Sequence, residues 1–335
     1  MLKSRRADAV VFGFDFQVNA AIVLFLQNVE QVEKIRLEGN YEDIEIQLNS
    51  GEMVMAQAKA VEKASFDFNN VRKNIKKALR SLSEADNKVN ARDLIVITNS
   101  PNPFNDTQSM SAFYGHAHRK YDSLPPTAKE MVDKYLNELD KPLDVNKLTI
   151  QVLPFETDDD DERYKVILQI INDFVGRLKT NVPGVGRQLL ETWHWQIFDN
   201  GGKENVDIKL SKKDIIWPLL VKITEIAQCD DEFLEQFDSC MYEEIVNRYA
   251  DIINSHCEQC EFFIKILSDY NMFKTEKKPI EKMAEFIEKN WENYVSEFYV
   301  EGLESEIQEA ITKIVMHNII RRKFTIDRIK KEVNL

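Results

Sequence analysis

The segment from Glu38 to Lys59 constrains the fold of this chain more than any other part of the sequence. It contains two stretches in which apolar and polar residues alternate, YEDIEIQL and MVMAQAK, on either side of Asn49-Ser50-Gly51. Side chains along a β-strand point alternately to opposite faces, so each stretch is typical of a strand with one apolar face. The segment therefore predicts an antiparallel β-hairpin.

The turn decides which polar side chains share a face of this hairpin. A three-residue loop with Gly51 in the left-handed conformation pairs Asp43 with Gln57. A two-residue loop at Ser50-Gly51 changes the register by one residue and moves the side chains of one strand to the other face. With the three-residue loop, the polar side chains form one cluster, made of Asp43, Glu45, Gln57 and Lys59.

Such a cluster suits phosphodiester hydrolysis with a divalent cation. Mg²⁺ prefers oxygen ligands, keeps several waters and bridges to phosphate groups. A lysine beside the metal can orient or deprotonate an attacking water and offset the charge that builds on phosphorus. The alternative is a half-exposed hairpin whose outer face is polar without a catalytic role, since alternation of this kind is common.

An aspartate followed one hairpin later by Q-x-K resembles the PD-(D/E)XK restriction-endonuclease signature in its Q-x-K form. The preceding sequence is similar as well, with Gly13-Phe14-Asp15-Phe16-Gln17 opening an apolar helix and Glu38 shortly before Asp43. This order resembles the double-stranded DNA endonuclease domain of antiphage effectors, namely the CD-NTase-associated nuclease of CBASS systems and the nuclease of Lamassu-type systems. The resemblance covers roughly the first third of the chain.

The resemblance implies an α/β restriction-endonuclease-like N-terminal domain, a mixed sheet flanked by helices, that requires Mg²⁺ or Mn²⁺. It implies Asp43 as the main metal ligand, Gln57 at the usual acidic position, Lys59 as the catalytic lysine and Glu38 as a supporting acid. Glu45 is a further candidate ligand on the same face. Because Gln57 departs from the commoner Asp or Glu, the resemblance leaves open whether one or two metal ions bind.

The segment from Asn69 to Leu82 predicts an amphipathic helix with a basic face. Its apolar residues recur at helical spacing, and its cations occupy the other side. We expect duplex phosphates to lie against these cations, which are Arg72, Lys73, Lys76, Lys77 and Arg80. The alternative is an ordinary solvated helix face.

Charge is distributed unevenly along the chain. The first 100 residues carry 14 basic and 14 acidic side chains, whereas the rest carry 30 and 43, which accounts for the net charge of −13. The N-terminal third can therefore approach a polyanion, and the acidic remainder is better suited to a protein partner.

Two domains are predicted, with a break at the Pro and Gly residues between 180 and 187. Residues 1–180 form the nuclease-like domain, with a helix that starts at an N-cap residue, Asp15, and buried strands at 93–98 and 148–155. A long loop is expected at 99–126. Residues 187–335 form an acidic all-helical domain for interaction or oligomerisation, with helices near 187–197, 211–227, 230–255, 258–271, 278–297 and 303–331.

The cysteines invite a zinc assignment, because Cys257 and Cys260 have zinc-knuckle spacing. All four, Cys229, Cys240, Cys257 and Cys260, fall in helical patterns, which disfavours structural zinc and favours reduced thiols.

The apolar run Val18–Val29 is shorter than the roughly 20 residues that span a bilayer. We therefore expect a cytoplasmic protein without a membrane segment.

These features predict a gated DNA endonuclease that acts as an effector in bacterial antiphage defence. The chain has no Walker motif, so an SMC-like ATPase or another sensor would be a separate subunit, and we also expect a homo-oligomer. No cyclic-nucleotide sensor is evident in the helical half, which favours the Lamassu-type arrangement. The alternatives are a non-catalytic DNA- or protein-binding scaffold with a degenerate nuclease domain, and an RNA-cleaving toxin.

Overall fold

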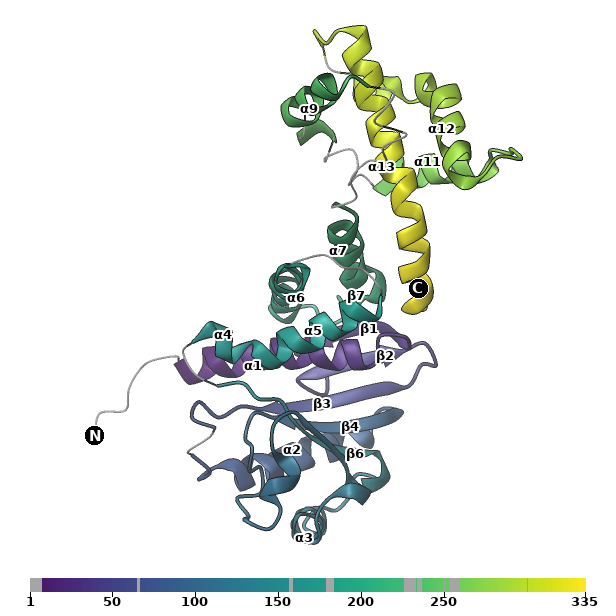
Figure 1. Cartoon of the computed structure of the whole chain (residues 1–335). Coiled ribbons are helices and arrows are strands. Elements are labelled where there is room, and N and C mark those ends of the chain that lie inside the picture. Colours follow the sequence, from purple (N-terminus) through teal and green to yellow (C-terminus); the bar gives the residue numbers. More distant parts are fainter. Residues whose placement is uncertain are drawn as a thin grey trace. The chain divides into compact units, whose positions relative to one another are not determined.

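The computed structural model describes residues 8–64, 67–156, 159–178, 184–225, 233, 237–249, 251–253, 260–299 and 301–335 (Figure 1). The chain forms two compact units. The first, called the sheet unit, extends to Leu219 and includes Val333–Leu335. The second, called the helical unit, is Leu220–Glu332.

The sheet unit is built on a mixed seven-stranded sheet in the order β5-β6-β4-β3-β2-β1-β7. Parallel pairing joins the central strands β3 (Met53–Lys59), β4 (Ala91–Thr98) and β6 (Leu148–Val152). Antiparallel pairing adds β2 (Ile44–Leu48), β1 (Val32–Leu37) and β7 (Leu210–Ser211) on one side and β5 (Ala117–Lys120) on the other. The predicted mixed sheet with flanking helices is confirmed.

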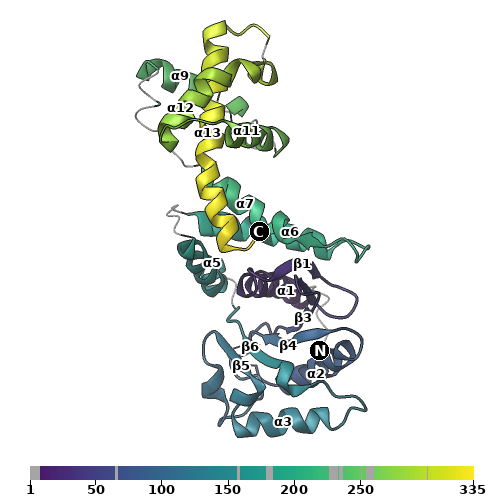
Figure 2. The same ribbon diagram turned by 90° about the vertical axis from the view of Figure 1, so that its right-hand side faces the viewer.

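Helices cover both faces of this sheet (Figures 1 and 2). One face carries α1 (Asp8–Gln27), α4 (Asp160–Arg163), α5 (Lys165–Arg177) and α6 (Val185–Gly201). The other carries α2 (Val71–Asp86) and α3 (Pro126–Leu136). Because Met55 packs with Ile75 and Leu79 of α2, the alternate positions of β3, such as Ala56, face α1. The hydrophobic core is therefore split into two layers by the sheet.

The hairpin β2–β3 has the register predicted for a three-residue loop. Ile44 pairs with Ala56 and Gln47 with Met53, so the same alignment sets Asp43 opposite Gln57. The amide of Gly51 donates to the carbonyl of Leu48 at 2.8 Å, and Gly51 has a φ of 82°. A side chain at Gly51 would be strained in this left-handed conformation, so the glycine fixes the turn.

Helix α1 begins at Asp8, seven residues before the predicted N-cap. Asp15 lies inside the helix and accepts hydrogen bonds from the Tyr164 hydroxyl at 3.0 Å and the Asn19 amide at 2.9 Å, with the His194 ring at 2.8 Å. The N-cap prediction for Asp15 is therefore wrong. Its carboxylate binds side chains of Asn19, Tyr164 and His194 and does not cap the amides of a helix terminus.

Within the described chain, α1 is long and apolar enough to span a membrane, and 56% of its apolar window is buried.

The boundary between the two units lies at Leu219, beyond the predicted break at 180–187. Helix α6 belongs to the sheet unit because Arg36 of β1 donates to carbonyls at and beyond its C-terminal end. The Arg36 guanidinium reaches Asn200 O at 2.5 Å, Lys203 O at 2.7 Å and Ile208 O at 3.1 Å. Strand β7 then pairs with β1, which keeps the chain on the sheet as far as α7 (Lys212–Glu225).

The segment 99–126 is not a simple loop. It contains the 3-10 helix η1 (Met110–Phe113), the edge strand β5 and the 3-10 turn η2 (Tyr121–Ser123). A further 3-10 turn, η3 (Val145–Lys147), leads into β6. The buried rings of Phe104 and Phe113 pack together with their centroids 5.6 Å apart, which anchors this segment to the core.

The helical unit agrees with the predicted helical C-terminal region. Its described elements are α9 (Ser239–Arg248), α11 (Cys260–Met272), α12 (Pro279–Asn290), the 3-10 turns η4 (Trp291–Asn293) and η5 (Val295–Phe298), and α13 (Ser305–Glu332). Cys240 is exposed and free. Cys229 and Cys257 lie outside the described residues, as does the side chain of Cys260, so the expectation about zinc stays a prediction.

Candidate active site

Asp43 lies directly before β2, at the end of the sheet where β3 finishes. One of its carboxylate oxygens, Oδ2, accepts from the backbone amide of Ala58 at 2.9 Å and from the side-chain amide of Gln57. The ammonium of Lys59 is 3.7 Å from the same oxygen. The hairpin therefore brings Asp43, Gln57 and Lys59 together, and all three side chains are largely buried at its edge.

Gln57 acts in this arrangement as a hydrogen-bond donor to Asp43. Its side chain is 6% exposed and lies between Asp43 and the core on the α2 side of the sheet. The ligand role expected for its carbonyl oxygen stays a prediction. In the observed orientation Gln57 instead fixes the Asp43 carboxylate, because two donors hold the same oxygen.

Glu38 is the second acidic residue of the site. Its backbone amide donates to the Asp43 carbonyl at 2.8 Å, which continues the β1–β2 pairing by one residue. Burial raises the pKa of Glu38, and the nearby negative charge of Asp43 raises it further, whereas Gln17 of α1 and Lys59 act in the opposite direction. Two acids that repel each other across this edge favour a bound cation between them.

Glu45 lies on the predicted face of the hairpin, but its carboxylate faces the loop between β1 and β2. Its Oε1 atom accepts from the backbone amides of Tyr41 at 2.6 Å and Glu42 at 3.2 Å, and the side chain is buried. Glu45 holds the loop between β1 and β2, on which Glu38 and Asp43 are carried.

Gly39 lies against this carboxylate, because a Cβ atom built at Gly39 would overlap the Glu45 carboxyl group. We expect Gly39→Ala to destabilise the protein by about 1–3 kcal/mol, since the buried carboxylate must move and lose its backbone partners. Urea unfolding measures the change. Gly13→Ala is the matched control, because that position is helical and nothing lies within 4 Å of the added Cβ. Equal stability of the two variants would contradict the role given to Glu45.

Glu42 is an acid beside the site that the sequence analysis missed. It is 5% exposed, and burial raises its pKa to about 8, with a further contribution from Asp43 and opposing ones from Ser81 of α2 and from Lys59. The only sequence signal was its position next to Asp43. Its burial follows from the loop turning back toward α2, which alternation along a strand does not predict.

The raised pKa of Glu42 predicts that stability falls as pH rises. Between pH 5 and pH 8 the unfolded chain has released this proton while the folded chain still holds it, so the free energy of unfolding decreases. We expect Glu42→Gln to remove that decrease, on the order of 1–3 kcal/mol, because the glutamine does not titrate. Urea unfolding in EDTA at the two pH values checks this. Parallel pH profiles for wild type and variant would contradict it.

The basic face of α2 is divided between internal contacts and solvent. Arg72 donates to the carbonyls of Phe104 at 2.6 Å and Asn105 at 2.8 Å, and Lys76 pairs with Glu138. Arg80 makes a longer contact of 3.4 Å with Glu84. Lys73 and Lys77 are exposed, and neither forms an ion pair with the residues that the structure describes. The predicted helix is confirmed, but only part of its stripe is free for a polyanion.

The donor set fits a hard divalent cation that has few protein ligands. The described residues contain no group of three or more His, Cys, Asp or Glu side chains that could hold a metal. Asp43 and Glu38 supply carboxylates at the end of the sheet where β3 finishes, and the positive charge of Lys59 balances part of their negative charge. Mg²⁺ is commonly held by one or two carboxylates together with waters and substrate phosphates, and Asp43 and Glu38 are carboxylates of this kind.

Comparisons with protein-family models, with curated proteins and with solved structures find no match for this chain. The geometry of Asp43, Gln57 and Lys59 is therefore the main guide to function.

Proposed function

We propose that this chain is a Mg²⁺-dependent endonuclease for double-stranded DNA. The observation that carries the proposal is the convergence of Asp43, Gln57 and Lys59 from neighbouring strands, with Glu38 beside them. An acid directly before β2 and an amide and an amine on β3, together at one end of these strands, match the arrangement that the PD-(D/E)XK resemblance implies. Rigid strands are also a favourable support for catalytic groups, because they hold them within narrow limits.

In the proposed reaction, Asp43 and Glu38 would hold Mg²⁺, or Mn²⁺ in its place. When bound, the cation polarises a phosphate oxygen and lowers the pKa of a coordinated water. Lys59 orients the attacking water and offsets negative charge on the phosphate, as its position 3.7 Å from Asp43 Oδ2 allows. The amides of Ala58 and Gln57 keep the Asp43 carboxylate in one orientation.

A plasmid assay with the full-length chain tests this proposal. Supercoiled DNA is incubated with Mg²⁺, with Mn²⁺ and with EDTA, and nicked and linear products are measured on gels. We expect cleavage with either cation and none with EDTA. The same assay with a transcribed RNA tests the RNA-cleaving alternative. Because the chain is expected to be gated, calorimetric titration of Mg²⁺ is run in parallel, and absence of both cleavage and Mg²⁺ binding would refute the proposal.

DNA binding is assigned to the exposed part of the basic helix. The connection from β3 to the parallel strand β4 passes through α2, so the N-terminal end of α2 lies toward the end of β3 that carries Lys59. Lys73 and Lys77 extend from this half of α2 and are exposed. Arg72, Lys76 and Arg80 are given a smaller role, because they already have carbonyl or carboxylate partners.

We expect the double variant Lys73→Glu/Lys77→Glu to bind duplex DNA more weakly. Each lost phosphate contact lowers the slope of log K against log salt by about 0.9, so the slope should fall by roughly 2. Fluorescence anisotropy at several salt concentrations measures both quantities. Lys134→Glu/Lys141→Glu makes the same charge change at exposed positions in α3 and just after it, and serves as control. Equal loss in both variants would show a general charge effect instead of a binding face.

The acidic part of the chain beyond residue 100 is better suited to binding a protein than DNA. Residues beyond 100 carry the whole net charge of −13, which disfavours DNA on that part and favours contacts with protein. We propose that it mediates homo-oligomerisation and association with a separate SMC-like ATPase or another sensor, within a Lamassu-type antiphage system. The proposed location is the cytoplasm.

A non-catalytic DNA- or protein-binding scaffold is the second candidate. It is favoured by Gln57, which stands where the family usually has an acid, and by the lack of a cluster of three acidic or histidine ligands among the described residues. Under this hypothesis the chain would bind DNA with the same salt dependence but would neither bind Mg²⁺ at Asp43 nor cleave DNA.

A further inference from the structure

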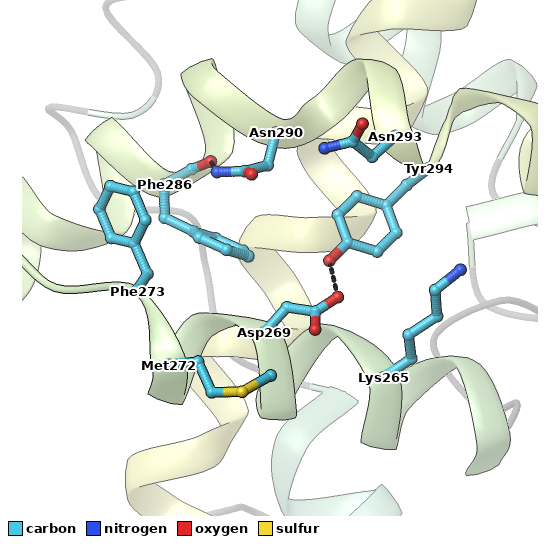
Figure 3. Close-up of a pocket in the computed structure, with 8 residues that line it drawn as sticks. All are labelled: Lys265, Asp269, Met272, Phe273, Phe286, Asn290, Asn293 and Tyr294. Atoms are coloured by element: carbon cyan, nitrogen blue, oxygen red, sulfur yellow. Dashed lines mark hydrogen bonds between the residues drawn. The ribbon is translucent and has the colours of Figure 1, made fainter.

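The helical unit contains a pocket of about 420 Å³ between α11, α12 and η4 (Figure 3). All its lining residues belong to the helical unit. Pockets of roughly 300–1,000 Å³ accommodate drug-sized ligands. A single ion or one amino-acid side chain would leave most of this space unfilled.

Aromatic side chains form the floor of the pocket. Phe286 and Tyr294 are each 2% exposed, so the partly exposed Phe273 and the exposed Met272 present most of the accessible apolar surface. Phe273 packs against Phe286 with ring centroids 5.5 Å apart, and Met272 is exposed at the mouth. Flat aromatic surfaces beside a flexible thioether favour a planar ligand that can stack.

Two side chains that line the pocket offer hydrogen-bond acceptors. Asp269 accepts from the Tyr294 hydroxyl at 2.5 Å, which uses one carboxylate oxygen and fixes the group in place. The Asn290 amide donates to the Phe286 carbonyl at 2.8 Å, which leaves its amide oxygen as an acceptor (Figure 3). Burial and the adjacent carboxylate of Asp269 raise the pKa of Tyr294, so its hydroxyl stays protonated as a donor. The pocket therefore calls for a ligand with N–H donors.

A cation lies at the other side of the pocket. The ammonium of Lys265 is 5.5 Å from the Tyr294 ring centroid and 3.6 Å from a Glu297 oxygen, and its side chain is half exposed. An arginine side chain could satisfy Asp269 but would bring a second positive charge toward Lys265. A ligand that combines a planar N–H-bearing ring with an anionic group satisfies both ends.

We propose that this pocket binds a nucleoside phosphate. The base lies on Phe273 and Met272, its N–H groups donate to Asp269 and Asn290, and its phosphate pairs with Lys265. This inference rests on the pocket alone and does not depend on nuclease activity in the sheet unit. A free mononucleotide and the 5′-phosphorylated end of an oligonucleotide offer the same chemistry.

Calorimetric titration of the full-length chain tests the proposal. AMP, GMP, CMP and UMP are titrated separately in EDTA, followed by a 5′-phosphorylated single-stranded oligonucleotide. We expect at least one of these probes to bind, and Asp269→Asn and Lys265→Ala each to weaken binding about tenfold, since each removes a charge-assisted contact. Binding of a mononucleotide identifies the free ligand, whereas binding of the oligonucleotide alone identifies a chain end.

Lys274→Ala is the matched control, because it removes an exposed lysine outside the pocket. Asp269 also supports Tyr294, so circular dichroism checks the fold, and Lys265→Glu provides a variant at an exposed position that should abolish binding without disturbing the core. Absence of binding by all probes up to about 1 mM overturns the proposal. Binding that is equal in wild type, Asp269→Asn and Lys265→Glu also overturns it.

Discussion

Lys59→Ala is expected to lower Mg²⁺-dependent DNA cleavage by about 10²–10⁴-fold, the usual cost of removing a group that positions or deprotonates water or neutralises developing charge. The ammonium of Lys59 is 3.7 Å from Asp43, so its loss removes the positive charge nearest the proposed metal ligand. The fold should be retained because Lys59 is the last residue of β3 and its side chain is partly exposed. Initial rates of plasmid nicking measure the effect.

Lys63→Ala is the control for this experiment. Lys63 is an exposed lysine four residues further along the chain, and its side chain has no hydrogen bond or ion pair in the part that the structure describes. DNA affinity is measured for both variants, so that a loss of binding is separated from a loss of catalysis. If Lys59→Ala cleaves as fast as Lys63→Ala, the lysine has no catalytic role. If neither the variants nor the wild type cleaves DNA, the measurement of Mg²⁺ binding by Asp43 decides between the hypotheses.

Asp43→Asn is expected to weaken Mg²⁺ binding tenfold or more and to reduce cleavage by about 10²–10⁴-fold. Asn is chosen because its side-chain oxygen can still accept from the Ala58 amide, whereas the negative charge that attracts the cation is lost. Calorimetric titration of Mg²⁺ measures the first effect without requiring an active enzyme. It therefore separates a gated nuclease, which binds the metal while inactive, from a scaffold that binds none.

The same charge change elsewhere provides the comparison for Asp43→Asn. Glu62→Gln removes one exposed carboxylate from the loop after β3 and should leave Mg²⁺ affinity unchanged. Thermal unfolding with and without Mg²⁺ gives a second readout, since a ligand that binds only the folded state raises the melting temperature. Unchanged Mg²⁺ affinity in Asp43→Asn would remove this carboxylate from the proposed site.

Features set by neighbouring residues were predictable from the sequence. Alternation predicted the strands β2 and β3, and the observed register is that of the three-residue loop, one of the two turns that the sequence allowed. The two faces of α2 follow from helical spacing, and the buried positions Ile75, Leu79 and Leu82 lie where that spacing predicts. The mixed sheet and the helical C-terminal region were likewise predictable from residue patterns.

Features set by distant partners were not predictable in this way. Glu45 lies on the predicted polar face, yet its carboxylate turns toward the amides of the loop before β2. Arg72 belongs to the predicted basic stripe, but its guanidinium caps carbonyls near Phe104, more than thirty residues away. No local pattern identifies such partners, because they meet only after the sheet has formed.

The sequence by itself predicted the two strands of the hairpin and limited the placing of Asp43 relative to Gln57 and Lys59 to two turn geometries, because strand alternation and turn geometry act over a few residues. The structure decided between these two turns. Tertiary structure alone decided that Glu45 supports the loop, that Glu42 is buried beside Asp43, and that α6 stays with the sheet through Arg36. The physical reason is that a buried polar group must find a partner or change its protonation state, and which of these occurs depends on the groups that folding brings next to it.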